Sequence, residues 1–168
     1  MMSLLATFEQ SGISVWVRET PSIFAFPFIL FLHTLGLAML AGISVGLDIW
    51  LLGAKSRPPR ALLVGVYRIM WIGFGINLLS GLALLAAYPA KALTNWVFFL
   101  KLALVAAALW VLEQTKGELL VATGGGTATV NSRTRILAAL SLVFWAGAIF
   151  AGRLLAYTHS ILLASEGF

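Results

Sequence analysis

Residues 26–52 read FPFILFLHTLGLAMLAGISVGLDIWLL, a run long enough to cross a lipid bilayer. A membrane-spanning helix needs about 20 mostly apolar residues, because the hydrocarbon core of a bilayer is about 30 Å thick. The run contains two ionisable side chains, His33 in its first half and Asp48 near its end. Ionisable groups are costly inside a membrane, so each of them marks a candidate functional position.

The composition extends this prediction to the whole chain. Of its 168 residues, 61% are hydrophobic and 10% are charged, and the mean hydropathy is +1.00. A soluble domain carries about 25% charged residues, so we predict an integral membrane protein. The net charge of +5 does not indicate nucleic-acid binding, because the basic residues are spread among loops that flank the spans. The absence of cysteine excludes disulfides, thiolate metal sites, iron–sulfur clusters and covalently attached c-type haem.

Three further apolar runs follow the first, separated by polar segments that contain proline or glycine. We predict an all-α fold with one membrane domain, 1–168, built as a four-helix transmembrane bundle. A short interfacial segment at 3–19 precedes the bundle. The predicted spans are about 23–52, 62–88, 96–114 and 136–164, with loops at 53–60, 89–95 and 115–135.

Four spans place both termini on one side of the membrane. The loops on the opposite side carry Lys55, Arg57, Arg60, Lys116, Arg133 and Arg135, whereas the terminal side carries Arg18 and Lys91. Short loops rich in Lys and Arg stay in the cytoplasm. We therefore expect a multi-pass protein of the bacterial inner membrane with both termini in the periplasm.

The chain has two histidines, His33 in the first predicted span and His159 late in the fourth. His33 lies six residues after Pro27, and His159 lies six residues before Ser165. At 1.5 Å per residue each is about 9 Å deep, measured from the same side of the membrane. The two imidazoles are therefore expected to meet at one level on the periplasmic side.

Two facing imidazoles are the axial ligands of a low-spin b-type haem. Gly36 and Gly152 lie beneath the two histidines, where small residues leave room for a flat macrocycle. The alternative is that each histidine is an interfacial residue with hydrogen bonds between helices. A zinc site would need more ligands, and Met39, a ligand for copper, lies nearly two turns deeper than His33.

Other polar residues in the spans have open roles. Lys101 reaches the depth of the histidines, where it either snorkels to the headgroups or pairs with a haem propionate. Arg153 has three unranked partners, a propionate, a lipid or a neighbouring subunit. Asp48 and Arg68 are expected to form an ion pair, and Asn77 is expected to form a hydrogen bond between helices.

The sequence resembles a known family in three stretches: WVRETPSIFAFPFILFLHTLGLAMLAG at 16–42, MWIGFGINLLSGLALL at 70–85 and FWAGAIFAGRLLAY at 144–157. It is similar over about 15–165 to small bacterial four-helix membrane proteins, described as hypothetical or as copper-resistance-D-like, some of them b-type haem proteins. The resemblance implies a haem-binding bundle with ligands at His33 and His159, and a homo-oligomer such as a trimer. With two histidines, a second bis-histidine haem is not expected.

These features predict a membrane-bound cytochrome with one haem b near the periplasmic face. It would carry one electron between the quinone pool and a periplasmic or membrane redox partner, and the sequence shows no general base or nucleophile of an enzyme. His33 and His159 would bind the iron, while Lys101 and Arg153 would balance the propionate charge. The alternatives are a structural or assembly subunit without haem, a copper-handling membrane protein, and a quinol or superoxide oxidoreductase built on the same haem.

Overall fold

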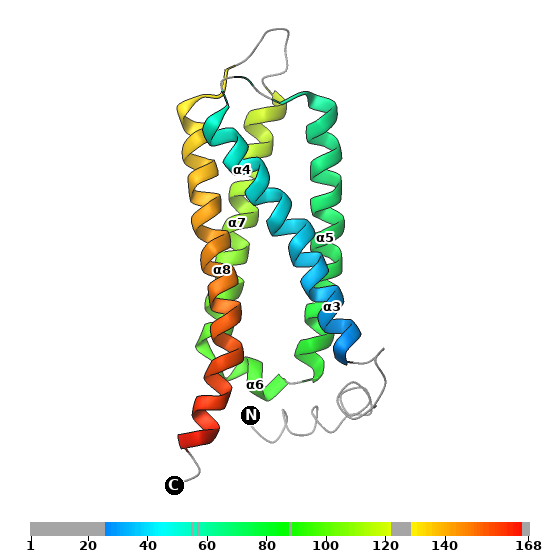
Figure 1. Cartoon of the computed structure of the whole chain (residues 1–168), viewed down its shortest axis with the longest axis vertical. Helices are drawn as coiled ribbons and strands as arrows, with labels where there is room; N and C mark the ends of the chain where they lie inside the picture. The colour runs from blue at the N-terminus through cyan, green and yellow to red at the C-terminus, as the bar shows by residue number, and fades with distance from the viewer. Residues whose placement is uncertain (1–25, 55, 57, 88, 122–128, 166–168) are drawn as a thin grey trace.

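The computed structural model describes residues 26–54, 56, 58–87, 89–121 and 129–165; of 90, 91, 121 and 156–165 only the backbone is described. The predicted interfacial segment at 3–19 lies outside the described residues. The fold is all-α, as predicted. The helices are α3 (Phe26–Leu37), η1 (Ala38–Gly42), α4 (Ile43–Gly53), α5 (Arg60–Ala87), α6 (Pro89–Leu93), α7 (Trp96–Val121) and α8 (Ser132–Ser165) (Figure 1).

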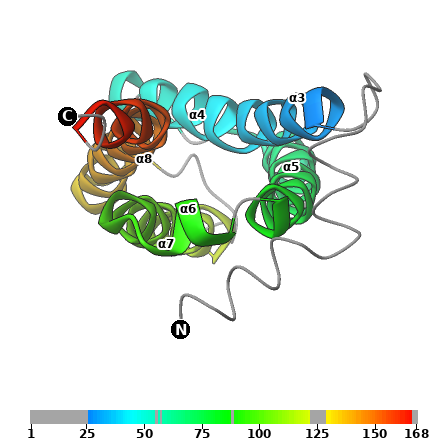
Figure 2. The same ribbon diagram turned by 90° about the horizontal axis from the view of Figure 1, so that it is seen from below.

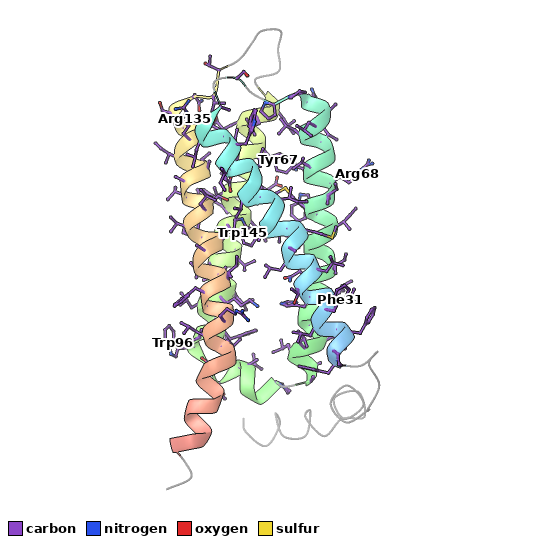
Figure 3. The ribbon with its side chains drawn as sticks, in the orientation of Figure 1. Phe31, Tyr67, Arg68, Trp96, Arg135 and Trp145 are labelled. Atoms are coloured by element: carbon purple, nitrogen blue, oxygen red, sulfur yellow. The ribbon has the colours of Figure 1, made fainter. Side chains whose placement is uncertain are left out.

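Four helical segments in the described part of the chain are long and apolar enough to span a bilayer. They are Phe26–Gly53, Arg60–Ala87, Trp96–Leu120 and Ser132–Leu155. The chain is therefore a multi-pass membrane protein. Large apolar side chains cover the outside of the bundle, as lipid contact requires. Phe31 and Trp96, both well exposed, point outward near the end of the bundle where α8 finishes (Figure 3).

The first span crosses the bundle diagonally (Figure 1). Its first half, α3, packs against α5, and its second half, α4, packs against α8. α7 lies along α8, whereas α5 and α7 hardly touch, so the α3–α5 and α7–α8 pairs diverge where α3 begins (Figures 1 and 2). We call that end, where α3 begins and α8 finishes, the terminal end, and the opposite end the loop end.

A short π-helix, η1, joins the two halves of the first span. A π turn takes more residues than an α turn, so it shifts the helical face that follows it. η1 itself contacts α5. The shift allows one continuous apolar run to face α5 before the π turn and α8 after it.

The contact between α3 and α5 is made through glycines. A Cβ atom built on Gly36 would lie 2.5 Å from the backbone nitrogen of Asn77 and 2.8 Å from the carbonyl oxygen of Gly73. A Cβ on Gly73 would lie 2.6 Å from the Cβ of Met39. The volume at Gly36 is therefore filled by the backbone of α5. The expectation from the sequence, that Gly36 leaves room for a macrocycle, is wrong.

The loop end differs from the prediction. α7 continues to Val121, although the sequence predicted a loop from 115. The hydroxyl of Thr115 donates to the carbonyl oxygen of Val111 at 3.0 Å, and Leu119 is fully buried, so polar residues extend the helix without exposing its apolar face. α8 begins at Ser132 because Asn131 Oδ1 accepts the backbone N–H of Thr134 at 2.7 Å as a helix cap.

Substituting Gly36→Ala is expected to destabilise the protein, because its methyl group would overlap the backbone of α5. Forced overpacking costs about 1–3 kcal/mol. Gly65→Ala is the matched control, since a Cβ at Gly65 meets nothing within 4 Å. Thermal unfolding of both variants in mild detergent should show a lower Tm for Gly36→Ala alone; equal Tm values would contradict the close glycine contact.

Candidate functional site

His33 lies on α3 and turns its imidazole toward α5. Its Nδ1 atom is 3.0 Å from the backbone oxygen of Asn77 and 3.2 Å from the Oγ atom of Ser80. A carbonyl oxygen only accepts, so Nδ1 is the donor and carries the proton. The Ser80 hydroxyl is directed to the carbonyl oxygen of Ile76 at 2.6 Å, so it too receives the hydrogen of Nδ1. The neutral imidazole therefore has a bare Nε2 atom.

Asn77 completes the contact from the other side. Its Nδ2 atom donates to the backbone oxygen of His33 at 2.7 Å. The hydrogen bond between helices that the sequence predicted for Asn77 is thus confirmed. The two residues bond reciprocally, each through its side chain to the backbone of the other, and this fixes the rotation of α3 on α5.

Gly81 provides the surface on which the imidazole lies. A Cβ atom at Gly81 would come 3.0 Å from Cε1 of His33 and 3.4 Å from Nδ1. Gly73 and Gly81 therefore do different things on one face of α5: the first admits the backbone of α3, and the second admits the ring. The two glycines therefore form a packing seam for α3, with the histidine as part of it.

The Nε2 atom of His33 makes no hydrogen bond within the described ranges. A histidine that binds a metal commonly donates its other ring N–H to a backbone carbonyl, which fixes the tautomer and orients the ring. His33 has this arrangement through Asn77. The hydrogen bonds of Nδ1 therefore leave Nε2 as the ring atom that could hold a metal.

Lys101 enters the same region from α7. Its side chain is half-buried and runs over Gly152 of α8, where a Cβ atom would lie 3.7 Å from Cε and 3.9 Å from Nζ of the lysine. Its ammonium is close enough to His33 to interact with it electrostatically. The structure therefore brings Lys101 and Gly152 together near His33, although the residues come from three helices.

The two other predicted site residues, His159 and Arg153, both belong to α8. His159 belongs to α8, but its side chain lies outside the described residues. Arg153 is exposed on the same helix. The structure therefore leaves the pairing of the two histidines untested.

Metal sites built only from protein ligands are not apparent in the described part of the chain. No group of three or more His, Asp or Glu side chains is close enough to hold an ion there. Met39 packs against Gly73, and Met70 is fully buried in the core. These methionines serve helix packing, and they do not form a path for copper.

The expected ion pair between Asp48 and Arg68 is wrong. Asp48 is buried against α8, whereas Arg68 is exposed and its side chain points away from the bundle (Figure 3). The sequence places both residues at one depth but does not define the rotation of their helices. It also missed Ser80 as a partner of His33; the spacing of Asn77 and Ser80, one turn apart on α5, was the signal available.

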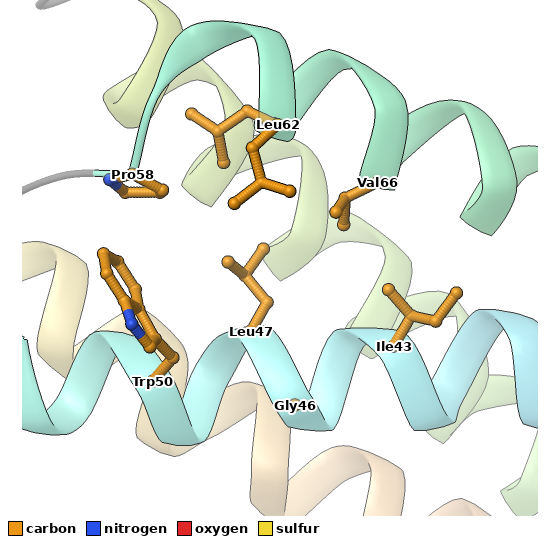
Figure 4. A pocket seen from close by; sticks show the side chains of 8 residues that line it. Ile43, Gly46, Leu47, Trp50, Pro58, Leu62 and Val66 are labelled. Carbon is orange, nitrogen blue, oxygen red and sulfur yellow. The ribbon is translucent and has the colours of Figure 1, made fainter.

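An apolar groove of about 340 Å³ opens between α4 and α5 near the loop end (Figure 4). Its walls carry almost no polar surface, so it has nothing to orient a polar headgroup. Its shape and chemistry suit a lipid chain or an isoprenoid tail. The lining residues are Ile43, Gly46, Leu47, Trp50, Pro58, Leu62, Leu63 and Val66.

Comparison with known proteins gives no relative: no family model, no curated protein and no solved structure matches the chain. The fold and the site define a four-helix, multi-pass membrane protein with a hydrogen-bonded histidine inside the bundle.

Replacing Asn77 by Leu is expected to destabilise the bundle, because the His33 carbonyl loses its donor and the α3–α5 contact loses one of its three hydrogen bonds. Hydrogen bonds between membrane helices contribute about 0.6–2 kcal/mol. Thr34→Val is the matched control, since that hydroxyl only bonds Leu30 of its own helix at 3.0 Å. Unfolding in mixed micelles should separate the two variants; an unchanged stability of Asn77→Leu would contradict the reciprocal contact.

Proposed function

We propose that the protein is a membrane-bound b-type cytochrome that holds one bis-histidine haem toward the terminal end of the bundle. The observation that carries the proposal is the bifurcated hydrogen bond of His33 Nδ1 to Asn77 and Ser80. It holds the imidazole in the tautomer whose Nε2 atom binds iron. The second ligand in this proposal is His159, the other histidine of the chain.

The hydrogen bond of His33 Nδ1 supports binding of this group. Haem b is held by its axial side chains, and the carbonyl of Asn77 supplies the partner that orients a ligating histidine. The α3–α5 and α7–α8 pairs diverge at this end, so a group bound between them would join His33 to α8. When bound, the haem would supply one-electron oxidation and reduction.

Lys101 is the charge partner in this proposal. Its ammonium lies half-buried between α7 and α8, close to His33, and makes no hydrogen bond or ion pair within the described residues. A cation in apolar surroundings needs an anionic partner. A haem propionate would meet this need. Arg153, being exposed, suits a lipid headgroup or a neighbouring subunit better than a group inside the bundle.

The location and partners follow from the same proposal. The basic loops would lie in the cytoplasm of a bacterium and the terminal end would face the periplasm. Electrons would pass between the quinone pool and a periplasmic or membrane redox partner. The groove between α4 and α5 offers a surface for an isoprenoid tail. A homo-oligomer is part of the proposal, because Gly42 and Gly46 are exposed and a Cβ atom at either would meet nothing within 4 Å in the described part of the chain.

One observation favours a second candidate, a structural or assembly subunit without haem. The bonds of His33 to Asn77 and Ser80 join α3 to α5 whether or not iron is present. In that case the histidine would serve only helix packing, and the purified protein would be colourless.

An absorption spectrum decides between the two. The protein purified in mild detergent is expected to show a Soret band and, after dithionite, sharp α and β bands. His33→Ala and His159→Ala should each abolish the low-spin spectrum, because each removes an axial ligand. Ser80→Ala is the control: it removes one of two acceptors of Nδ1 and should keep the bands. A colourless protein would overturn the cytochrome and leave the structural subunit.

Replacing Lys101 by Gln is expected to lower the midpoint potential of the haem. A nearby positive charge disfavours the oxidised, more positive haem, so its removal favours oxidation. Lys116→Gln is the matched control, because Lys116 lies toward the loop end and is already paired with Glu113 at 3.2 Å. Spectroelectrochemical titration measures both; an equal potential in wild type and Lys101→Gln would contradict the role of Lys101.

A further inference from the structure

A second polar cluster lies inside the bundle on the loop-end side, on α4, α5 and α8. All its side chains are less than 4% exposed. The members are Ser44, Asp48, Tyr67, Ser141 and Trp145. Polar groups buried at this level inside a membrane protein are costly unless they are bonded, so the cluster requires an explanation.

Ser44 is the bonded member of the cluster. Trp145 Nε1 donates to Ser44 Oγ at 3.0 Å, and the Ser44 hydroxyl donates to Asp48 Oδ2 at 3.4 Å. Trp145 has no other polar atom, and it is fully buried among the helices (Figure 3). The chain of donors therefore ends on the carboxyl of Asp48.

Two further buried hydroxyls, those of Ser141 and Tyr67, interact with this carboxyl. Ser141 Oγ and the Tyr67 hydroxyl are both fully buried and unbonded in the described part of the chain. Ser141 lies next to the carboxyl of Asp48, and Tyr67 is close enough to interact with it electrostatically. Unbonded buried hydroxyls are rare in proteins, and they commonly mark an unseen water or ion.

No basic side chain of the described residues neutralises Asp48. Arg68 points away from the bundle (Figure 3), and Arg135 donates to the carbonyl oxygen of Ala54 at 3.1 Å. Lys116 pairs with Glu113 and stands over the ring of Tyr67, 5.7 Å from its centre. Glu113 of α7 also faces the region of Tyr67, and its carboxylate adds negative charge there.

We propose that Asp48, Ser44, Ser141 and Tyr67 form a binding site for one monovalent cation, which is either a proton carried with ordered water or a sodium ion. The carboxyl supplies one negative charge, so one positive charge balances it. The unbonded hydroxyls supply the remaining oxygen atoms. In the sodium case each hydroxyl oxygen would coordinate the ion. In the proton case each hydroxyl would form hydrogen bonds with the ordered water.

The number of charges excludes a divalent ion. Calcium and magnesium are bound by several oxygen ligands, including carboxylates that offset their charge. One carboxyl would leave a net positive charge in the apolar interior, which is as costly as the bare carboxylate. A monovalent cation leaves the site neutral.

Tyr67 links the site to charged side chains nearer the loop end. Its hydroxyl interacts electrostatically with Asp48 and also with Glu113, which is exposed. The ring of Tyr67 lies under the ammonium of Lys116, which is partly exposed. Glu113 therefore adds negative charge on the loop side of the site. The site does not depend on whether a haem is bound at the other end.

The experiment combines two measurements on the detergent-solubilised protein. Infrared difference spectra of wild type against Asp48→Asn at neutral pH show whether the carboxyl is protonated. Thermal unfolding in sodium chloride, compared with choline chloride at equal ionic strength, shows whether sodium binds. A carboxylic-acid band that Asp48→Asn removes identifies the proton. A sodium-dependent rise of Tm that Asp48→Asn removes identifies the sodium ion.

Tyr67→Phe tests the site with the charge kept. It is expected to shift the carboxylic-acid band in the proton case, or to weaken sodium binding by about ten- to a hundredfold in the sodium case, since a bond to a charged group is worth about 1.5–3 kcal/mol. Thr115→Val is the matched control, because that buried hydroxyl is bonded within α7. An ionised carboxylate in wild type with no sodium dependence would overturn the proposal, and so would a Tyr67→Phe variant that matches wild type in both measurements.

Discussion

The close approach of α3 and α5 at Gly36 and Gly73 is the constraint on which the arrangement of the bundle depends. The hydrophobic effect does not drive helices together in lipid, because lipid tails are as apolar as the side chains. Close backbone contact and hydrogen bonds therefore decide which helix surfaces meet. With no side chain between them, the two backbones come near enough for His33 and Asn77 to bond each other's carbonyl oxygens. A larger residue at either glycine would separate the helices and remove both bonds.

The first span uses a different polar contact in each half. Before the π turn, His33 bonds to α5; after it, Ser44 accepts from Trp145 of α8 and bonds Asp48. Each contact is buried or half-buried, so a rotated or slipped helix would leave these groups unpaired in an apolar interior. The polar residues therefore specify the partner of each half, while the apolar residues specify only that the segment lies in the membrane.

The sequence predicts the number and order of the spans because hydropathy measures their length directly. It also predicts the bond of Asn77, since an amide at mid-membrane needs a partner. It fails where helix rotation matters: Asp48 is buried on the side of α4 that packs against α8, whereas Arg68 is exposed, and so their ion pair does not form. It also places the end of α7 too early, because a helix continues past the bilayer when its polar residues bond within it.

Each end of the bundle contains an ionisable side chain inside the membrane that lacks a partner of opposite charge among the described residues. Lys101 lies five residues into α7 near the terminal end, whereas Asp48 lies five residues before the loop end of α4. They are separated by most of the bundle length and do not neutralise each other. The described side chains supply no anion that pairs with Lys101 and no basic group that pairs with Asp48. Apolar residues at both positions would give a more stable bundle, so stability alone does not explain Lys101 and Asp48.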